Sequence, residues 1–367
     1  MASDGNSVDR QEQRSTDQLI VAEGVAGSAG GDVAEFEQGR SLLDRLQRFL
    51  HSHPTASPVL VLLIAFTFFS FATDRFFTAT NASTMLAQVM IIGTLGIAQT
   101  LVILTAGIDL SVGAITLFAS VVMGKLAIVW GYDPWIALAV GIGVGLACGA
   151  GNGMLVTKLK LPPFIATLGT LSIFAALAQW FSDNATLRNS DVVAEANILL
   201  WFGKVWEPVS GFRVTFGVLF MLVLYGLSMY ALKRTAWGQH VYATGDDPET
   251  ARLVGIRTNR VLLSVYAVAG LLCGLAGWMW ISRIGAVSPI PIANANLDSI
   301  TAVVIGGTSL FGGRGNILGT LIGALIVGVF DSGLSQLGFQ PLWRVFAIGV
   351  LVLVAVSLDQ WIRRVAA

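Results

Sequence analysis

Charged side chains are scarce in this chain. They make up 12% of its 367 residues, whereas hydrophobic residues make up 54%. A soluble domain carries about 25% charged residues because its surface must be hydrated, so most of this chain's surface faces something other than water. Lysine and arginine together number 22, and aspartate and glutamate also number 22. This balance gives no basic surface for nucleic acid, and no nucleic-acid partner is expected.

Cysteine and histidine are also rare. Cys148 and Cys273 lie within apolar runs and are typical of small buried hydrophobic residues. The three histidines do not combine with them in a metal-binding spacing. The chain lacks the Gly-x-x-x-x-Gly-Lys-Ser/Thr loop that binds ATP, and it lacks zinc-protease and serine-hydrolase motifs. We therefore expect no metal, no bound cofactor, no catalytic residue and no enzymatic activity in this chain.

Long uncharged apolar runs are abundant. A helix needs about 20 apolar residues to cross the hydrocarbon core of a membrane. The expected fold is an all-α integral membrane protein of about ten transmembrane helices, some short or broken, in the cell (inner) membrane. The predicted spans are 54–73, 85–107, 110–130, 134–157, 161–182, 214–232, 261–282, 299–313, 315–330 and 345–358.

The distribution of polar residues predicts the domain organisation and the orientation. Residues 1–53 form a polar tail that we expect to be partly disordered and cytoplasmic, followed by a transmembrane domain over 54–364. With ten spans, most lysines and arginines fall on the side of this tail, as the positive-inside rule requires. Both termini are then cytoplasmic, and so is the charged loop 233–260. The segment 183–211 is predicted to be a polar outer loop.

The cytoplasmic loop contains the signals of a short helix. Asp247 can cap its first turn, Pro248 suits the first helical position and Glu249 favours the positive end of the helix dipole. Gly255 can end the helix in a left-handed conformation. A helix of two turns is unstable alone and must pack on something. It is either an ordinary connector or a docking element for a partner.

Several segments resemble ABC importer permeases. The spacing over 249–255, which includes Ala251 and Arg252, is similar to the Glu-Ala-Ala-x-x-x-Gly loop that docks into the ATPase of such importers; Thr250 replaces its middle alanine. Three longer segments, 100–114, 161–170 and 302–315, resemble ribose-type monosaccharide permeases of the branched-chain amino acid/ribose permease family. The segments 234–248 and 359–367 look most like fructose permeases.

The resemblance implies a transport subunit and its partners. Two permease subunits would form the pathway as a homodimer, an extracytoplasmic sugar-binding protein would deliver the monosaccharide, and separate ATPase subunits would use ATP. The alternative is a secondary sugar transporter driven by an ion gradient. Such a transporter ordinarily has a relay of charged residues within the membrane, and here Asp109 is nearly alone between apolar runs.

Candidate pathway residues lie near glycine-rich turns. The pattern Gly-x-x-Leu-x-x-Gly occurs at 107–113 and again at 307–313, and we expect half-helices or tight turns at Gly107 and at 312–313. Asp109 either supports a half-helix at the pathway or caps the next helix together with Ser111. Asn152 belongs either to a small-residue packing face or to a sugar contact. The segment 294–298 is either an outer connecting loop or a contact for the sugar or its binding protein, through Asn296 and Asp298.

Overall fold

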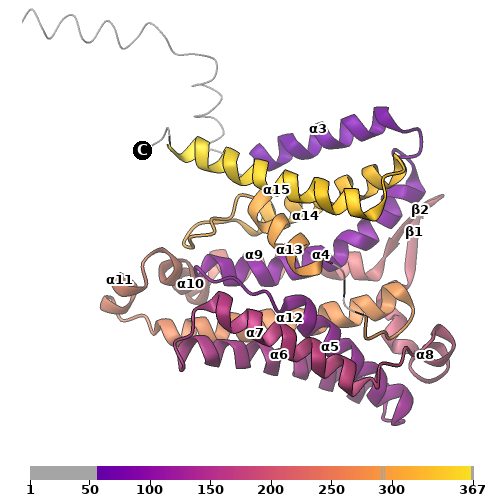
Figure 1. Cartoon of the computed structure of the whole chain (residues 1–367), viewed down its shortest axis with the longest axis horizontal. Coiled ribbons are helices and arrows are strands. Elements are labelled where there is room, and N and C mark those ends of the chain that lie inside the picture. The colour runs from indigo at the N-terminus through magenta and orange to yellow at the C-terminus, as the bar shows by residue number, and fades with distance from the viewer. Residues whose placement is uncertain (1–55, 291, 293, 365–367) are drawn as a thin grey trace, which may run out of the picture. The chain divides into compact units, whose positions relative to one another are not determined.

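The computed structural model describes residues 56–290, 292 and 294–364, and the predicted tail 1–53 lies outside the described residues. The long elements are helices (Figure 1). They are α3 (Ala56–Ala72), α4 (Ala79–Leu104), α5 (Val112–Gly124), α6 (Pro134–Thr157), α7 (Pro163–Phe181), α9 (Phe216–Arg234), α12 (Thr258–Ile284), α14 (Ile317–Gln336) and α15 (Pro341–Arg364). The shorter elements are η1 (Lys125–Val129), α8 (Asn189–Glu195), η2 (Asn197–Gly203), β1 (Val205–Val209), β2 (Phe212–Thr215), α10 (Ala236–Asp246), α11 (Pro248–Leu253) and α13 (Ala295–Ile305).

Local capping residues set several helix starts. The Asp133 carboxylate accepts the backbone N–H of Trp135 at 2.9 Å, and Pro134 begins α6. Asn316 accepts the N–H of Leu318 at 3.1 Å at the start of α14. These signals can be read from the sequence because they involve neighbouring residues only.

Seven helices are long and apolar enough to cross a membrane, among the residues that the structure describes. They are α4, α5 continued by the π-helical turn η1, α6, α7, α9, α12 and α14. The apolar helices α3 and α13 and the segment Pro341–Leu351 of α15 are shorter. The prediction of a helical, multi-pass membrane protein is therefore confirmed at this level.

Two predicted segments differ from the structure. The predicted span 299–313 is a helix only as far as Ile305, because Gly306 caps α13 and Gly307 adopts a φ of +84°. The predicted loop 183–211 contains α8, η2 and the strand β1, which pairs antiparallel with β2. The expectation of an all-α chain is thus wrong for the short hairpin of β1 and β2. This hairpin lies outside the apolar runs that are long enough to cross a membrane.

Helix α12 lies at the centre of one packed group, beside α6, α5 and α4 (Figure 1). Glycines bring α6 and α12 into backbone contact: a methyl group on Gly145 would lie 2.6 Å from the Gly270 carbonyl oxygen, and one on Gly149 would lie 2.7 Å from the Gly270 Cα. Helix α14 packs on α13, α4 and α3. A second glycine contact joins α13 to α14, because a methyl group on Gly306 would lie 2.5 Å from the Gly319 carbonyl carbon.

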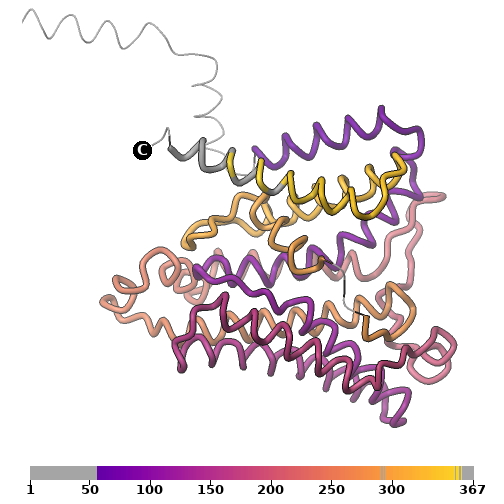
Figure 2. Tube along the Cα trace, viewed as in Figure 1, coloured from indigo at the N-terminus to yellow at the C-terminus, as the bar shows by residue number. Residues whose placement is uncertain are grey.

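The connections gather at two opposite ends of this helical region. Figure 2 shows the α10–α11 segment at one end and the chain of α8, η2 and the β1–β2 hairpin at the other. The turns after α4 and after α13 belong to the α10–α11 end, since the backbone N–H of Gly313 donates to the Leu104 carbonyl at 3.0 Å and both residues contact Gly245. The two ends are therefore built from different elements.

Candidate functional site

The start of α11 is a capped turn built from Asp247. One carboxylate oxygen accepts the backbone N–H groups of Glu249 at 2.9 Å and Thr250 at 3.1 Å. The other accepts the Thr250 hydroxyl at 2.5 Å. The Thr250 hydroxyl and these backbone N–H groups lower the pKa of the Asp247 carboxyl by stabilising its ionised form. The predicted cap and the predicted first-position Pro248 are both present.

The end of α11 is held by its own backbone. The N–H of Gly255 donates to the Arg252 carbonyl at 3.0 Å, and Gly255 has a φ of +92°. The Arg252 Nε donates to the Thr258 hydroxyl at 2.8 Å, which ties α11 to the first turn of α12. Ala251 is buried, whereas Leu253 is 88% exposed. The helix is therefore anchored on one face and free on the other.

Gly245, just before α11, lies against the turns that follow α4 and α13. A methyl group on Gly245 would overlap the Leu104 carbonyl oxygen and lie 2.8 Å from the Gly313 nitrogen. A methyl group on Gly312 would lie 2.6 Å from the Gly245 carbonyl oxygen and 2.8 Å from the Ala106 nitrogen. Main-chain atoms of three segments meet here with no side chain between them. We refer to this contact of Gly245 with Leu104, Gly312 and Gly313 as the glycine joint.

Beyond the turn after α4, four buried polar residues form a cluster. One Asp109 oxygen accepts the backbone N–H of Ser111 at 2.7 Å and the Ser111 hydroxyl at 2.6 Å. The Asn152 amide donates to the Ser111 hydroxyl oxygen at 2.7 Å, and the Gln99 amide donates to the Asp109 carbonyl oxygen. Asp109 is 1% exposed and has no ion-pair partner among the described residues. The structure thus brings Asn152 of α6 together with Asp109 and Ser111, which lie in a distant part of the sequence.

The same turn is fixed from α7 and α12. The Thr167 hydroxyl accepts the N–H of Leu110 at 3.1 Å and donates to the Ile108 carbonyl oxygen, also at 3.1 Å. A methyl group on Gly107 would lie 2.9 Å from the Tyr266 hydroxyl. The Tyr266 hydroxyl is buried without a hydrogen-bond partner among the described residues, as are the carbonyl oxygens of the Gln99 and Asn152 side chains. These three groups are free to bind a further donor or acceptor beside Asp109.

Of the two predicted residues on α13, one joins this region. The Asn296 side-chain oxygen accepts the backbone N–H of Gly113 at 2.7 Å, so α13 is tied to the first turn of α5. The Asp298 side chain makes no hydrogen bond or ion pair with another residue in the described part of the chain. Gln99, Thr167 and Tyr266 were not predicted, because single uncharged polar residues are common in apolar helices.

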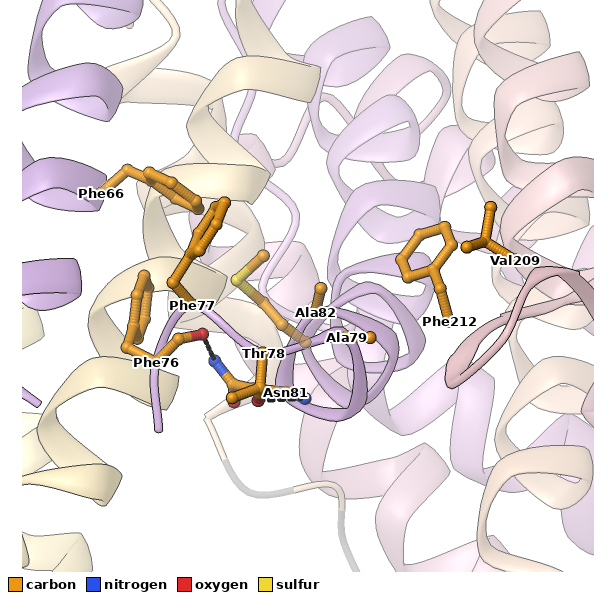
Figure 3. A pocket seen from close by; sticks show the side chains of 10 residues that line it. Phe66, Phe76, Phe77, Thr78, Ala79, Asn81, Ala82, Val209 and Phe212 are labelled. Atoms are coloured by element: carbon orange, nitrogen blue, oxygen red, sulfur yellow. Dashed lines mark hydrogen bonds between the residues drawn. The ribbon is translucent and has the colours of Figure 1, made fainter. Parts of the chain in front are cut away.

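A cavity of about 350 Å³ lies elsewhere, between the α3–α4 corner and the hairpin (Figure 3). Its one amide, Asn81, is already engaged: it donates to the Phe76 carbonyl at 2.9 Å and accepts the Ser332 hydroxyl at 2.7 Å. A sugar needs several free hydrogen-bonding groups, and this cavity offers mostly apolar surface. Its lining residues are Phe66, Phe76, Phe77, Thr78, Ala79, Asn81, Ala82, Met85, Val209 and Phe212.

Comparison with known proteins covers nearly the whole chain. A family model described as a permease component of branched-chain amino acid transport systems matches residues 81–356. A fructose import permease protein of Rhizobium meliloti is 50% identical over 94% of this chain and 96% of its own length. A ribose import permease protein of Bacillus subtilis is 38% identical over 83% of this chain and 92% of its own length. A D-allose transport system permease protein of Escherichia coli is 34% identical over 83% of this chain and 91% of its own length.

Proposed function

We propose that this chain, which belongs to the family of permease components of branched-chain amino acid transport systems, is the membrane-spanning subunit of an ATP-driven importer of a monosaccharide, most specifically fructose. The observation that carries the proposal is the 50% identity to a fructose import permease over 94% of the chain. The ribose and allose permeases among its relatives support the wider sugar class. The chain is a multi-pass protein of the cell (inner) membrane.

Helix α11 is the proposed docking element for a separate ATPase subunit, which binds and hydrolyses the ATP. The cap at Asp247 and the left-handed end at Gly255 make this short helix a defined body, and its outer face is exposed. A helix held on one face and free on the other suits insertion into a cleft of a partner. The residues assigned to docking are Asp247, Pro248, Glu249, Ala251, Arg252 and Gly255.

The glycine joint is the proposed route from the ATPase to the transport pathway. Because main-chain atoms are in contact there, a displacement of α11 moves the turns after α4 and α13 with it. Asp109, Ser111 and Asn152 hold the first of these turns as one hydrogen-bonded unit, and Asn296 joins α13 to α5. Gly107, in the same turn, donates its backbone N–H to the Val102 carbonyl at 3.1 Å. Asp298, whose carboxylate has no partner among the described residues, is assigned to the pathway itself.

The remaining parts of the proposal concern partners and topology. The end formed by α8, η2 and the hairpin is the side that receives an extracytoplasmic sugar-binding protein, and two copies of the permease form the pathway. Ten spans over 54–364, with α3, α13 and α15 counted among them, place both termini, the tail 1–53 and the coupling loop 233–260 in the cytoplasm. The basic residues of that loop agree with this orientation.

Uptake of labelled fructose tests the proposal directly. Cells with and without this protein are compared after ATP depletion and, separately, after collapse of the proton gradient. We expect uptake that needs the protein, stops without ATP and survives loss of the gradient. Uptake that follows the gradient would instead support a secondary transporter. Ribose or allose uptake without fructose uptake would keep the importer and change its sugar.

A further inference from the structure

Phe311 is an exposed aromatic residue on a turn outside the helices. It lies between α13 and α14, and its side chain is 84% exposed. The turn is closed by its own backbone, since the N–H of Ser309 donates to the Arg314 carbonyl at 2.8 Å and the N–H of Gly312 donates to the Ser309 carbonyl at 3.1 Å. The large apolar side chain is thus held on a defined turn and not on a flexible loop, and it offers an exposed surface to which a partner can bind.

The turn that carries Phe311 lies against the start of the docking helix. A methyl group on Gly313 would lie 2.7 Å from the Asp246 Cα, one residue before the Asp247 cap of α11. On α11 and directly after it, Leu253 is 88% and Val254 is 72% exposed. The same end of the molecule thus presents three large apolar side chains on two backbone segments that touch each other.

Basic residues border these apolar side chains. Arg252, Arg257 and Arg314 are exposed, and none of them forms an ion pair with another described residue. A complementary surface would therefore combine an apolar pocket with acidic side chains at its rim. Continuity with α11 favours a protein partner over lipid, because a body seated on α11 reaches the turn that contacts residues 245 and 246.

We propose that Phe311 is a second contact for the ATPase subunit, which receives it in an apolar pocket with an acidic rim beside the cleft that holds α11. This inference rests on the proposed role of α11. The ATPase then holds both sides of the glycine joint, α11 on one and the α13–α14 turn on the other. A movement within the ATPase acts on the two segments together instead of rotating α11 alone.

The test is recovery of the ATPase with tagged permease, both subunits being co-expressed and purified as the complex. Phe311→Ala is compared with Phe339→Ala, a 47% exposed phenylalanine in the turn at the opposite end of α14. Since large aromatic residues are common binding hot spots, we expect Phe311→Ala and Leu253→Ala each to lower the ATPase-to-permease ratio by at least about fivefold. Phe339→Ala should leave the ratio unchanged.

A photoreactive phenylalanine analogue at position 311 provides a second measurement that does not depend on stability. It should cross-link to the ATPase, and the same analogue at position 339 should not. A normal ratio and no cross-link at 311, with a low ratio in Leu253→Ala, would overturn the second contact and leave docking through α11 intact. Normal ratios in both variants would overturn both proposals. Cross-linking at 311 to lipid alone would assign Phe311 to the membrane surface.

Discussion

Asp109 is a buried carboxylate whose surroundings supply hydrogen bonds but no cation among the described residues. Its two short hydrogen bonds come from the N–H and O–H groups of Ser111, so its main structural role is to accept hydrogen bonds at the start of α5. Asn152 then donates to Ser111 from α6. This arrangement distinguishes two needs at one position: an acceptor atom, which an amide can replace, and a negative charge, which it cannot.

We expect Asp109→Asn to keep most of the transport activity and Asp109→Ala to lose it. Asparagine retains an oxygen for the two Ser111 donors, whereas alanine leaves them unpaired at a cost of about 1–3 kcal/mol. The measurements are labelled-sugar uptake and thermal unfolding of the purified permease in detergent. If asparagine is as damaging as alanine in uptake while the unfolding temperature is normal, the negative charge itself is required.

Position 245 requires glycine because there is no room for a side chain. A methyl group there would overlap the Leu104 carbonyl oxygen, which belongs to a segment more than a hundred residues away. We expect Gly245→Ala to destabilise the permease by about 1–3 kcal/mol, as overpacking does, and to reduce uptake strongly. Gly143→Ala on α6 is the control, because a methyl group there meets nothing within 4 Å. Equal unfolding temperatures for the two variants would contradict the tight contact.

The residue scale also shows what the sequence can reveal about the site. Asp109 is visible because an ionisable residue between apolar runs is costly unless it has partners. Its neighbours Gln99 and Thr167 carry no such signal, and they matter only because α4 and α7 pass the same turn. The requirement for glycine at 245 is equally invisible, since it depends on where another segment's carbonyl lies.

At the scale of elements, α11 and α13 differ in how far neighbouring residues determine them. Every signal for α11, from the Asp247 cap to the left-handed Gly255, lies within nine residues, and the structure has each of them. The end of α13 at Ile305 has local signals too, the cap at Gly306 and the left-handed Gly307, but Gly306 must also fit against Gly319 of α14, which no neighbouring residue reveals. Hydropathy alone extended this helix to 313 because the residues that follow are also apolar or small.

We expect Gly255→Arg to abolish uptake while leaving the amount of inserted permease near normal. The change adds a bulky cation and a strained left-handed side chain at the end of the docking helix. Gly338→Arg is the matched control: it has a φ of +81° and open space around it, but it follows the opposite end of α14. The measurements are uptake and the membrane content of each variant. Normal uptake by Gly255→Arg would count against coupling through α11.

At the scale of the whole molecule, α13 is too short to complete, as a helix, the crossing that the proposed ten-span topology assigns to it. Its 11 residues rise about 16 Å, roughly half of the 30 Å hydrocarbon core. The glycine-rich turn 306–316 continues beyond it. Irregular backbone at such a depth must be covered by protein or face a water-filled cavity. In the proposed topology the short helix would therefore lie inside the assembly and not against lipid.

Reporter fusions test the proposed ten-span topology. A fluorescent protein that folds only in the cytoplasm should be bright when fused after residue 367. Alkaline phosphatase, which is active only outside the cytoplasm, should be active when inserted at Gly211 in the tip of the hairpin between β1 and β2. The opposite result at the carboxyl terminus would be a dark fluorescent fusion after residue 367 and high activity of alkaline phosphatase fused there instead. It would imply an odd number of spans, counted from a cytoplasmic tail.

The glycine joint has a consequence for engineering. Its contacts are made by peptide atoms, which every amino-acid sequence possesses, and they demand only that the residues at 245, 312 and 313 stay small. We therefore expect the segment 236–257 to be exchangeable if the side-chain hydrogen bonds that it makes to the rest of the chain, from Trp237 to Ser264, from Tyr242 to Gly315 and from Arg252 to Thr258, are kept. A chimera that receives this segment from another sugar permease should accept the donor's motor subunit while retaining its own cargo, provided that the grafted segment has glycine at position 245.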